Sequence, residues 1–570
     1  MLKTARITAI VSVIASMMAT VHPAIAGDDG GWNDSDRHAR HVLLISIDGM
    51  HALDYRNCVT NGSCPHLAAL GARGVTYTRA SASKPSDSFP GLMALVSGGT
   101  PRTVGAFYDV AYDRVLAPPK NTTGNGVAGG SCVAGVPNGT TTEYEEGIDL
   151  DQSKLNGGGP YAATDGGIQS IDPTRLPRNP YDGCAPVYPW NFVRTNTVYG
   201  VIHAAHGYTA WSDKHAAYAA VSGPGHNASN IDDYYSPEVN SAVVPLPGVS
   251  TPMGMSCAPI ADPTQTGSWT DSFKNIQCYD MLKVDAVVNQ VKGLFHDGSR
   301  SAPVPAVFGM NFQAVSVGQK LIENGALVGG YSDAAGTPTP IMSAQIAFVD
   351  SSIGKMVRSL REQDLLDSTI IIVTAKHGQS PIDPARFFPI PGHSGGNGAT
   401  PANLVAGYLP YSESPLNPTG IGPTQDDISH LWLAHSADTD AVVQILEANA
   451  HAAGIGQIFY GASLETMFNR PGLPPAGDPR TPDIVVQPNV GVIYTESTKK
   501  QAEHGGFAQD DTNVMLVVSN PHLEAHRVTT AVETTQVAST ILQALGLDPA
   551  ALDAVRLEGT QVLPDLFRRR

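Results

Sequence analysis

Hydrophobic residues along the chain are concentrated in short runs that predict buried strands. Val42 to Ile47 is such a run, interrupted only by Ser46, and similar runs span Val304 to Phe312 and Thr369 to Thr374. Between the last two, apolar residues recur every three or four positions from Met342 to Glu362, which predicts an amphipathic helix. Because strand, helix and strand follow one another, the pattern predicts an α/β fold with a central, mostly parallel sheet flanked by helices.

The first and last of these strands end in polar residues followed by glycine. Asp48-Gly49 follows the first strand, and Lys376-His377-Gly378 follows the last one after Ala375. Open α/β sheets place their ligand-binding groups at the carboxyl ends of strands, so these residues are candidates for a functional site. The alternative for Asp48 is that it caps the helix that follows.

A third candidate lies where a polar loop enters a helix. The segment from Ser81 to Thr100 turns from polar to apolar, and a helix is predicted to begin at about Pro90. Ser88 would meet the free N–H groups and the positive end of that helix, which suits a nucleophile that receives a phosphoryl group. The alternative is that Ser88 is a plain helix N-cap.

The remaining segments are less regular. Residues from about 120 to 300 are rich in Gly, Pro, Tyr and Asn, and we interpret them as a loop-rich insertion that covers or shapes the site. Within it, we interpret Trp211 to His215 as a structural cluster, with substrate contact as the alternative. A small α/β subdomain, βαβ-like in order, is predicted at about 425–480. The main sheet is expected to resume at 483–494, followed by a strand at 514–518 and a last helix at 530–545.

The amino terminus has the features of an export signal. Two positive residues, Lys3 and Arg6, precede an apolar run from Ile7 to Thr20, and Ala24-Ile25-Ala26 is a typical cleavage site. We therefore predict a signal peptide over residues 1–26 and a mature chain over 27–570, in the periplasm or outside the cell. The apolar run is too short to span a bilayer, and we expect no other membrane span.

The cysteines agree with an oxidising compartment. All six lie in the predicted mature chain, and an even number in an exported protein favours disulfides. Fifteen pairings of six cysteines exist. Pairing between sequence neighbours is our working hypothesis: Cys58–Cys64, Cys132–Cys184 and Cys257–Cys278.

The charge of the chain narrows the range of partners. The formal net charge is −17, and removal of the signal peptide would make it more negative. An acidic surface argues against binding to nucleic acid or to anionic membranes. A small anionic substrate remains compatible with it, because a bound metal can dominate the local field.

Five segments, taken in order, resemble a known family: Leu44–Gly49, Lys84–Gly91, Leu365–Gly378, His504–Gly506 and Gln536–Leu547. They are similar to the type I phosphodiesterase/nucleotide pyrophosphatase branch of the alkaline phosphatase superfamily. The resemblance implies an alkaline phosphatase-like fold with a large insertion. It also implies a phosphoric ester hydrolase, more specifically a phosphodiesterase, that acts on a small phosphorylated substrate, and the predicted signal peptide makes this an exported enzyme.

The resemblance also implies roles for single residues. In that family two zinc ions flank a Thr or Ser nucleophile. Asp48 and His377 would bind one ion together with Ser88, the metal-activated nucleophile, and His504 would belong to the second ion. By residue type rather than by resemblance, three amides, Asn311, Gln313 and Gln319, are candidates for hydrogen bonding to substrate, because amides are poor ligands for divalent metals.

The chain departs from the family's motifs at several positions. Lys376 stands where the family has the aspartate of Asp-His-Gly, and Gly91 replaces an asparagine. The family's Asp-x-x-Gly-His is expected at about Val315 to Gln319, where its ligands are absent.

Two hypotheses follow from these departures. In the first, a divalent ion, zinc in first place with calcium or manganese as alternatives, binds between Asp48, Ser88 and His377, and Lys376 supplies a second, fixed positive charge to catalysis. The number of ions, one or two, stays open. In the second, the chain is a catalytically degenerate binding protein on the same fold.

Overall fold

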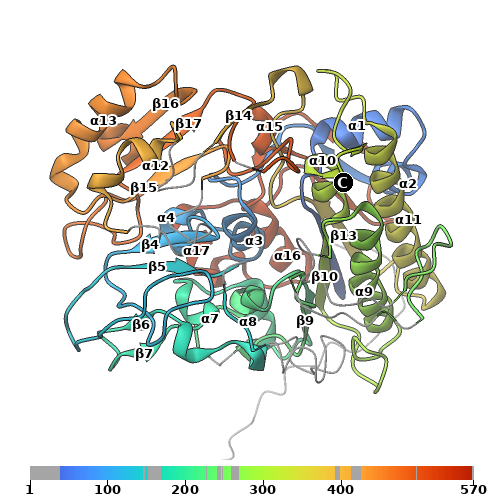
Figure 1. Ribbon diagram of the computed structural model, residues 1–570. Coiled ribbons are helices and arrows are strands. Elements are labelled where there is room, and N and C mark those ends of the chain that lie inside the picture. The colour runs from blue at the N-terminus through green and yellow to red at the C-terminus, as the bar shows by residue number, and fades with distance from the viewer. Residues whose placement is uncertain are drawn as a thin grey trace, which may run out of the picture.

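The computed structural model describes residues 39–145, 148–151, 168–225, 228–240, 246, 248–258, 269–391, 398–411, 425–495 and 497–567. Its centre is an eight-stranded sheet with the strand order β21-β2-β20-β13-β1-β10-β8-β9 (Figure 1). The strands are β1 (His41–Ile47), β2 (Gly74–Tyr77), β8 (Ala210–Ser212), β9 (Asp233–Tyr235), β10 (Val307–Phe312), β13 (Thr369–Thr374), β20 (Val517–Ser519) and β21 (His526–Val528). All neighbours are parallel except the two pairs made by β20. The predicted α/β class with a mostly parallel sheet is confirmed.

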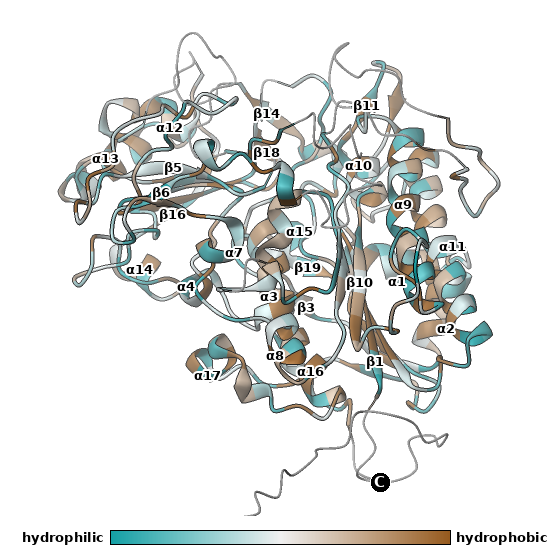
Figure 2. Ribbon diagram, turned by 90° about the horizontal axis from the view of Figure 1, so that it is seen from below, coloured by the Kyte–Doolittle hydropathy of each residue, from teal (hydrophilic) through white to brown (hydrophobic). Residues whose placement is uncertain are grey.

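Strand β1 lies in the middle of this sheet, which explains its continuous apolar sequence. It pairs with β10 on one side and with β13 on the other, so that Ser46 lies opposite both Asn311 and Thr374. Residues Val42–Ile47 are completely buried. In Figure 2 the central strands are coloured as hydrophobic and lie between layers of helices.

Helices cover both faces of the sheet. One layer contains α2 (Pro65–Gly71), α9 (Phe273–Val291), α10 (Ala314–Lys320) and α11 (Pro340–Glu362), and the other contains α3 (Ser88–Ser97), α8 (Val198–Ala204) and α16 (Gln536–Ala544) (Figures 1 and 2). Helix α11 confirms the predicted amphipathic helix. It begins two residues earlier than predicted because Thr339 caps it, accepting a hydrogen bond from Met342 N at 3.2 Å.

The expectation that the main sheet resumes at residues 483–494 is wrong. Strand β17 (Ile484–Pro488) is the middle strand of a separate three-stranded sheet, antiparallel to β15 (Ser429–Leu431) and β16 (Ile455–Tyr460). Helix α13 (Thr439–Ala448) connects the two outer strands and packs on β16. Strand β18 (Val492–Tyr494) pairs instead with β14 (Phe388–Ile390). An apolar run shows that a strand is buried but not which sheet it joins.

The carboxyl-terminal elements also differ in extent from the prediction. The strand expected at 514–518 is divided into β19 (Asn513–Val514) and β20. The last long helix begins at Gln536, because β22 (Val532–Glu533) pairs with β3 (Ala80–Ser81).

The segment from about 120 to 300 contributes to the main sheet. Its strands β8 and β9 extend the sheet beyond β10, and its helix α9 packs against α10 and α11. Strands of three residues are too short to show an alternating pattern, so β8 and β9 could not be predicted, and the interpretation of the segment as loop-rich also missed the 19 residues of helix α9.

All three expected disulfides are present: Cys58–Cys64, Cys132–Cys184 and Cys257–Cys278. None of the helices in the described residues is both long and apolar enough to cross a bilayer. The predicted signal peptide lies outside the described residues.

A buried carboxyl group in β5 (Thr140–Glu143) predicts a pH dependence of stability. Burial, and then the charge of Asp149, raises the pKa of Glu143 to about 8. Since the folded state holds this proton more tightly than the unfolded state, Glu143 lowers the free energy of unfolding as the pH rises from about 4.5 to about 8, by about 1.4 kcal/mol per unit of pKa difference.

Glu143→Gln is therefore expected to be more stable than wild type at pH 9 and to lose this advantage at pH 5. Urea unfolding of both proteins at the two pH values measures the difference. An advantage of equal size at both pH values would contradict the raised pKa.

Candidate active site

The site is formed at the carboxyl ends of three neighbouring strands. Because β10, β1 and β13 are parallel and in register, Asp48 after β1 meets Lys376 and His377 after β13 at one edge of the sheet. The Lys376 ammonium lies 3.9 Å from Asp48 Oδ2, and His377 Nε2 lies 3.7 Å from the same oxygen. The alternative role for Asp48 is not observed, since His51 is the N-cap of the following helix, α1 (Ala52–Thr60).

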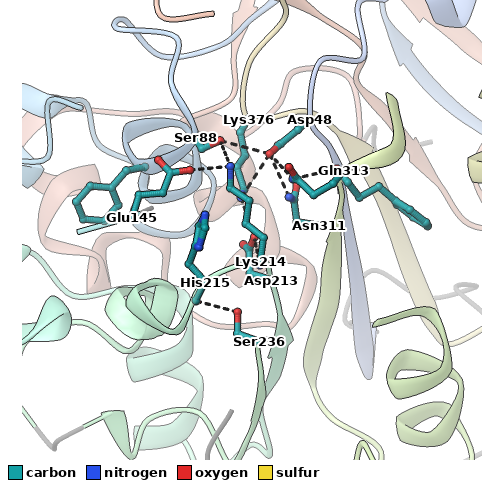
Figure 3. A network of polar contacts seen from close by, with 12 residues as sticks. Asp48, Ser88, Glu145, Asp213, Lys214, His215, Ser236, Asn311, Gln313 and Lys376 are labelled. Atoms are coloured by element: carbon teal, nitrogen blue, oxygen red, sulfur yellow. Dashed lines mark hydrogen bonds and ion pairs between the residues drawn. The ribbon is translucent and has the colours of Figure 1, made fainter. Parts of the chain in front are cut away.

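Ser88 lies at the first position of α3 and points into this cluster (Figure 3). Its Oγ is 3.3 Å from Asp48 Oδ2, 3.1 Å from His377 Nε2 and 3.2 Å from Lys214 Nζ. The N-cap role falls to Asp87, whose side chain accepts a hydrogen bond from Phe89 N at 3.3 Å. The Ser88 hydroxyl is thus free of the capping role and contacts an acid, an imidazole and an ammonium.

Gly91 permits the close approach of α3 to the strand end. A Cβ at this position would lie 2.4 Å from the carbonyl oxygen of Lys376. Since no real Cβ contact is this short, any larger residue would push the helix and Ser88 away from the Lys376–His377 turn. The asparagine that the resemblance leads one to expect at this position does not fit here.

Two residues that the sequence analysis assigned to a structural cluster, Asp213 and Lys214, belong to the site. They directly follow β8, whose Ser212 pairs with Met310 of β10. Lys214 donates a hydrogen bond to Ser88 and forms an ion pair of 2.7 Å with Glu145. Asp213 Oδ1 accepts a hydrogen bond of 2.9 Å from Lys376 Nζ. The signal for them is their place at the end of a strand, but β8 is too short to be seen in the sequence.

Two of the three amides expected to bind substrate contact Asp48 instead. Gln313 Nε2 donates to Asp48 Oδ2 at 2.7 Å, and Asn311 Nδ2 donates to the same oxygen at 3.1 Å (Figure 3). The third, Gln319, is engaged elsewhere. Its side-chain amide donates to Gly49 O at 2.7 Å and to Tyr331 Oη at 2.8 Å.

The last expected site residue, His504, lies beside the others. Its ring centre is 4.1 Å from that of His377, and its Nδ1 is 3.6 Å from Asp87 Oδ1. Burial, and then the charge of His377, lowers the pKa of His504 well below its usual value. His504 is therefore a neutral imidazole at neutral pH.

The pKa values of two carboxyl groups in the site, Asp48 and Asp87, are shifted in opposite directions. Burial alone would raise the pKa of Asp48, but the charges of Lys376 and His377 outweigh burial and hold this pKa well below its usual value. Burial and the charge of Glu145 raise the pKa of Asp87 well above its usual value, although Lys214 opposes the shift. Asp48 is thus an anion, whereas Asp87 keeps its proton to a higher pH than an ordinary aspartate.

The residues at Asp48 do not fit a divalent ion. A catalytic zinc takes three protein ligands and keeps a fourth position open for water or substrate, and among the described residues Asp48, His377 and Ser88 could supply the three. The fourth direction is taken by the ammonium of Lys376, and Asp48 Oδ2 already accepts two amide N–H groups. Around His504, Asp87 is the nearest acidic partner in the described part of the chain. No group of three or more His, Cys, Asp or Glu residues among the described residues is placed to hold one ion.

The comparison with protein families assigns the chain to a family. Residues 42–137 and 328–511 match the model of the family described as type I phosphodiesterase / nucleotide pyrophosphatase. The chain belongs to this family. Its matched segments contain Asp48, Ser88, Lys376, His377 and His504, and members of the family are typically metal-dependent.

Solved structures of the same description are also similar to the chain. Murine ectonucleotide pyrophosphatase / phosphodiesterase 5 matches with 12% identity and a TM-score of 0.47, over 89% of this chain and 96% of that one. An inactive form of the murine protein in complex with AMP matches with 13% identity and a TM-score of 0.47, over 90% and 96%. The human protein matches with 12% identity and a TM-score of 0.47, over 89% and 95%. The comparison with curated proteins gave no match.

Proposed function

We propose that this chain is an exported hydrolase of phosphoric esters, phosphodiesters in first place, with Ser88 as the nucleophile. The observation that carries the proposal is the convergence of Asp48, His377 and Lys214 on the Ser88 hydroxyl at the amino terminus of a buried helix. The family supports the reaction class, and the three disulfides support a compartment outside the cytosol.

His377 is oriented to accept the Ser88 proton. Its Nδ1 is 2.8 Å from the carbonyl oxygen of Gly378, which can only accept a hydrogen bond, so Nδ1 carries the hydrogen. In the neutral ring, Nε2 then carries the lone pair and faces Ser88 Oγ at 3.1 Å. This is the geometry of a nucleophile with an adjacent general base.

The proposed reaction has two steps. Ser88 Oγ attacks phosphorus as His377 takes its proton, the bond from phosphorus to the leaving oxygen breaks, and the leaving alkoxide takes a proton from solvent, to which His377 releases its own. Water then attacks the phosphoserine as His377 takes a proton from that water, the bond from phosphorus to Ser88 Oγ breaks, and His377 returns the proton to Ser88 Oγ. Lys214 and the N–H groups at the start of α3 stabilise the charge that develops on the transferred group.

The competing candidate is a binding protein without catalysis. The observation that favours it is burial, since Ser88, Asp48 and Lys376 have 0% exposed surface. A substrate reaches Ser88 only after the residues that cover it move. A protein whose family ligands have been replaced and whose nucleophile stays covered would bind a ligand without turning it over.

The test uses the full mature protein with bis(p-nitrophenyl) phosphate, and with p-nitrophenyl phosphate as the monoester. We expect faster release of p-nitrophenol from the diester. Acid quenching followed by peptide mass spectrometry is expected to find a phosphoryl adduct on the peptide that contains Ser88. Absence of both release and adduct, with and without added divalent metals, would favour the binding protein.

A further inference from the structure

We infer that Lys214 and Lys376 supply the positive charge that metal ions supply elsewhere in this family, so that Ser88 works without a divalent ion. The inference rests on the proposed function and names how its nucleophile is activated. Two observations support it: the positions of the two buried ammonium groups, and the positions in the sequence of the residues that form ion pairs with them.

Lys376 occupies the position of a cation beside Asp48. Its ammonium is completely buried, 3.9 Å from Asp48 Oδ2 and 2.9 Å from Asp213 Oδ1. It also lies 4.4 Å from the centre of the Tyr218 ring, which favours a cation over its face. A buried charge needs partners of opposite sign, and Lys376 has two carboxylates. A divalent ion bound to Asp48 would be repelled by this ammonium at short range.

Lys214 occupies the position of a cation beside the nucleophile. Its ammonium donates a hydrogen bond to Ser88 Oγ and forms an ion pair with Glu145 at 2.7 Å. A hydroxyl oxygen that loses its proton is stabilised by a charged donor at this distance, as it is by a metal ion. Lys214 therefore touches the reacting atom and acts as a catalytic residue.

The charged residues of the site lie partly inside and partly outside the segments that match the family model. Lys376 lies in a segment that matches the family model, at the position of an expected acidic ligand. Its partner Asp213, together with Lys214 and Glu145, lies between the matched segments 42–137 and 328–511. Lys376 and its partner Asp213 thus come from different parts of the chain and meet Lys214 and Glu145 at one site (Figure 3).

The first experiment measures bound metal and activity on the same wild-type sample. The protein is dialysed against EDTA, its metal content is determined by elemental analysis, and hydrolysis of bis(p-nitrophenyl) phosphate is measured before and after dialysis. We expect less than one ion per ten chains and unchanged kcat. Activity that falls on dialysis and returns with zinc would overturn this inference and leave the proposed function standing. A wild-type protein that is inactive with and without metals would overturn both.

The second experiment tests the lysine at the nucleophile. Lys214→Met is expected to lower kcat by about 10²- to 10³-fold with a smaller change in KM, because the stabilised charge develops in the transition state. Lys214→Arg keeps the charge and is expected to retain part of this activity.

Lys355→Met is the matched control, since Lys355 lies on α11 in a partly exposed ion pair with Asp285. Circular dichroism and the urea midpoint establish that each variant is folded. A folded Lys214→Met with wild-type kcat would overturn the role of Lys214.

Discussion

Ser88→Ala is expected to lower kcat/KM for bis(p-nitrophenyl) phosphate by about 10³-fold or more, the loss typical of removing a nucleophile. The reason is geometric, since Ser88 Oγ is the atom on which Asp48, His377 and Lys214 converge. The substitution also removes the phosphoryl adduct, because the residue that carries it is gone. Initial rates over a range of substrate concentrations, together with mass spectrometry of the quenched enzyme, measure both effects.

Ser86→Ala is the matched control for this prediction. Ser86 precedes the nucleophile by two residues, is equally buried, and its Oγ has no hydrogen-bond partner among the described residues. It should retain wild-type activity. Ser88→Ala is expected to lower the free energy of unfolding by about 1–3 kcal/mol, because the buried Oγ contacts the charged groups of Asp48 and Lys214. If Ser88→Ala keeps the wild-type rate, the hydrolysis takes place elsewhere on the protein and the proposed nucleophile is wrong.

The core of the site could be predicted because it depends on strand ends and short motifs. Asp48 and His377 each follow a long buried strand, and parallel neighbouring strands bring such residues together. Ser88 could be placed by the change from polar to apolar residues at the start of α3. The positions of these three residues in the fold can therefore be predicted from local sequence patterns.

The position of Lys214 could not be predicted from local sequence. Its position depends on a three-residue strand, β8, that pairs with β10 almost a hundred residues later. A strand that short has no readable period, and its pairing is decided by the packing of the whole sheet. The residues predicted at 483–494 illustrate the same limit, because the apolar run Ile484–Val486 predicts a buried strand but belongs to a different sheet. For Asn311 and Gln313, residue type indicated a hydrogen-bonding role, while only the structure shows that Asp48 is the partner.

Lys376→Met is expected to lower the free energy of unfolding at pH 7 by about 3–5 kcal/mol, the cost typical of removing one partner from a buried ion pair. Both carboxylates that face Lys376, Asp48 and Asp213, are completely buried, so neither recovers hydration when the ammonium is removed. Urea unfolding of the two proteins measures the change. Lys355→Met, in a partly exposed ion pair, is expected to change stability by less than about 1 kcal/mol.

A double variant separates the loss of charge from the loss of packing. In Lys376→Met/Asp213→Asn one of the two carboxylates left without the Lys376 ammonium is also removed, so the double variant is expected to be more stable than Lys376→Met alone.

The loss of stability caused by Lys376→Met also depends on pH. The pKa of Asp48 is depressed in the folded protein, so its stabilising contribution is present above the unfolded pKa of about 4 and is lost as the pH falls through the folded value. The stability difference between wild type and Lys376→Met should therefore be largest near neutral pH and shrink in acid. A stability difference that does not shrink as the pH falls into the acid range would mean that Lys376 stabilises the fold through packing, and its role as the charge that replaces a metal ion at Asp48 would fall with it.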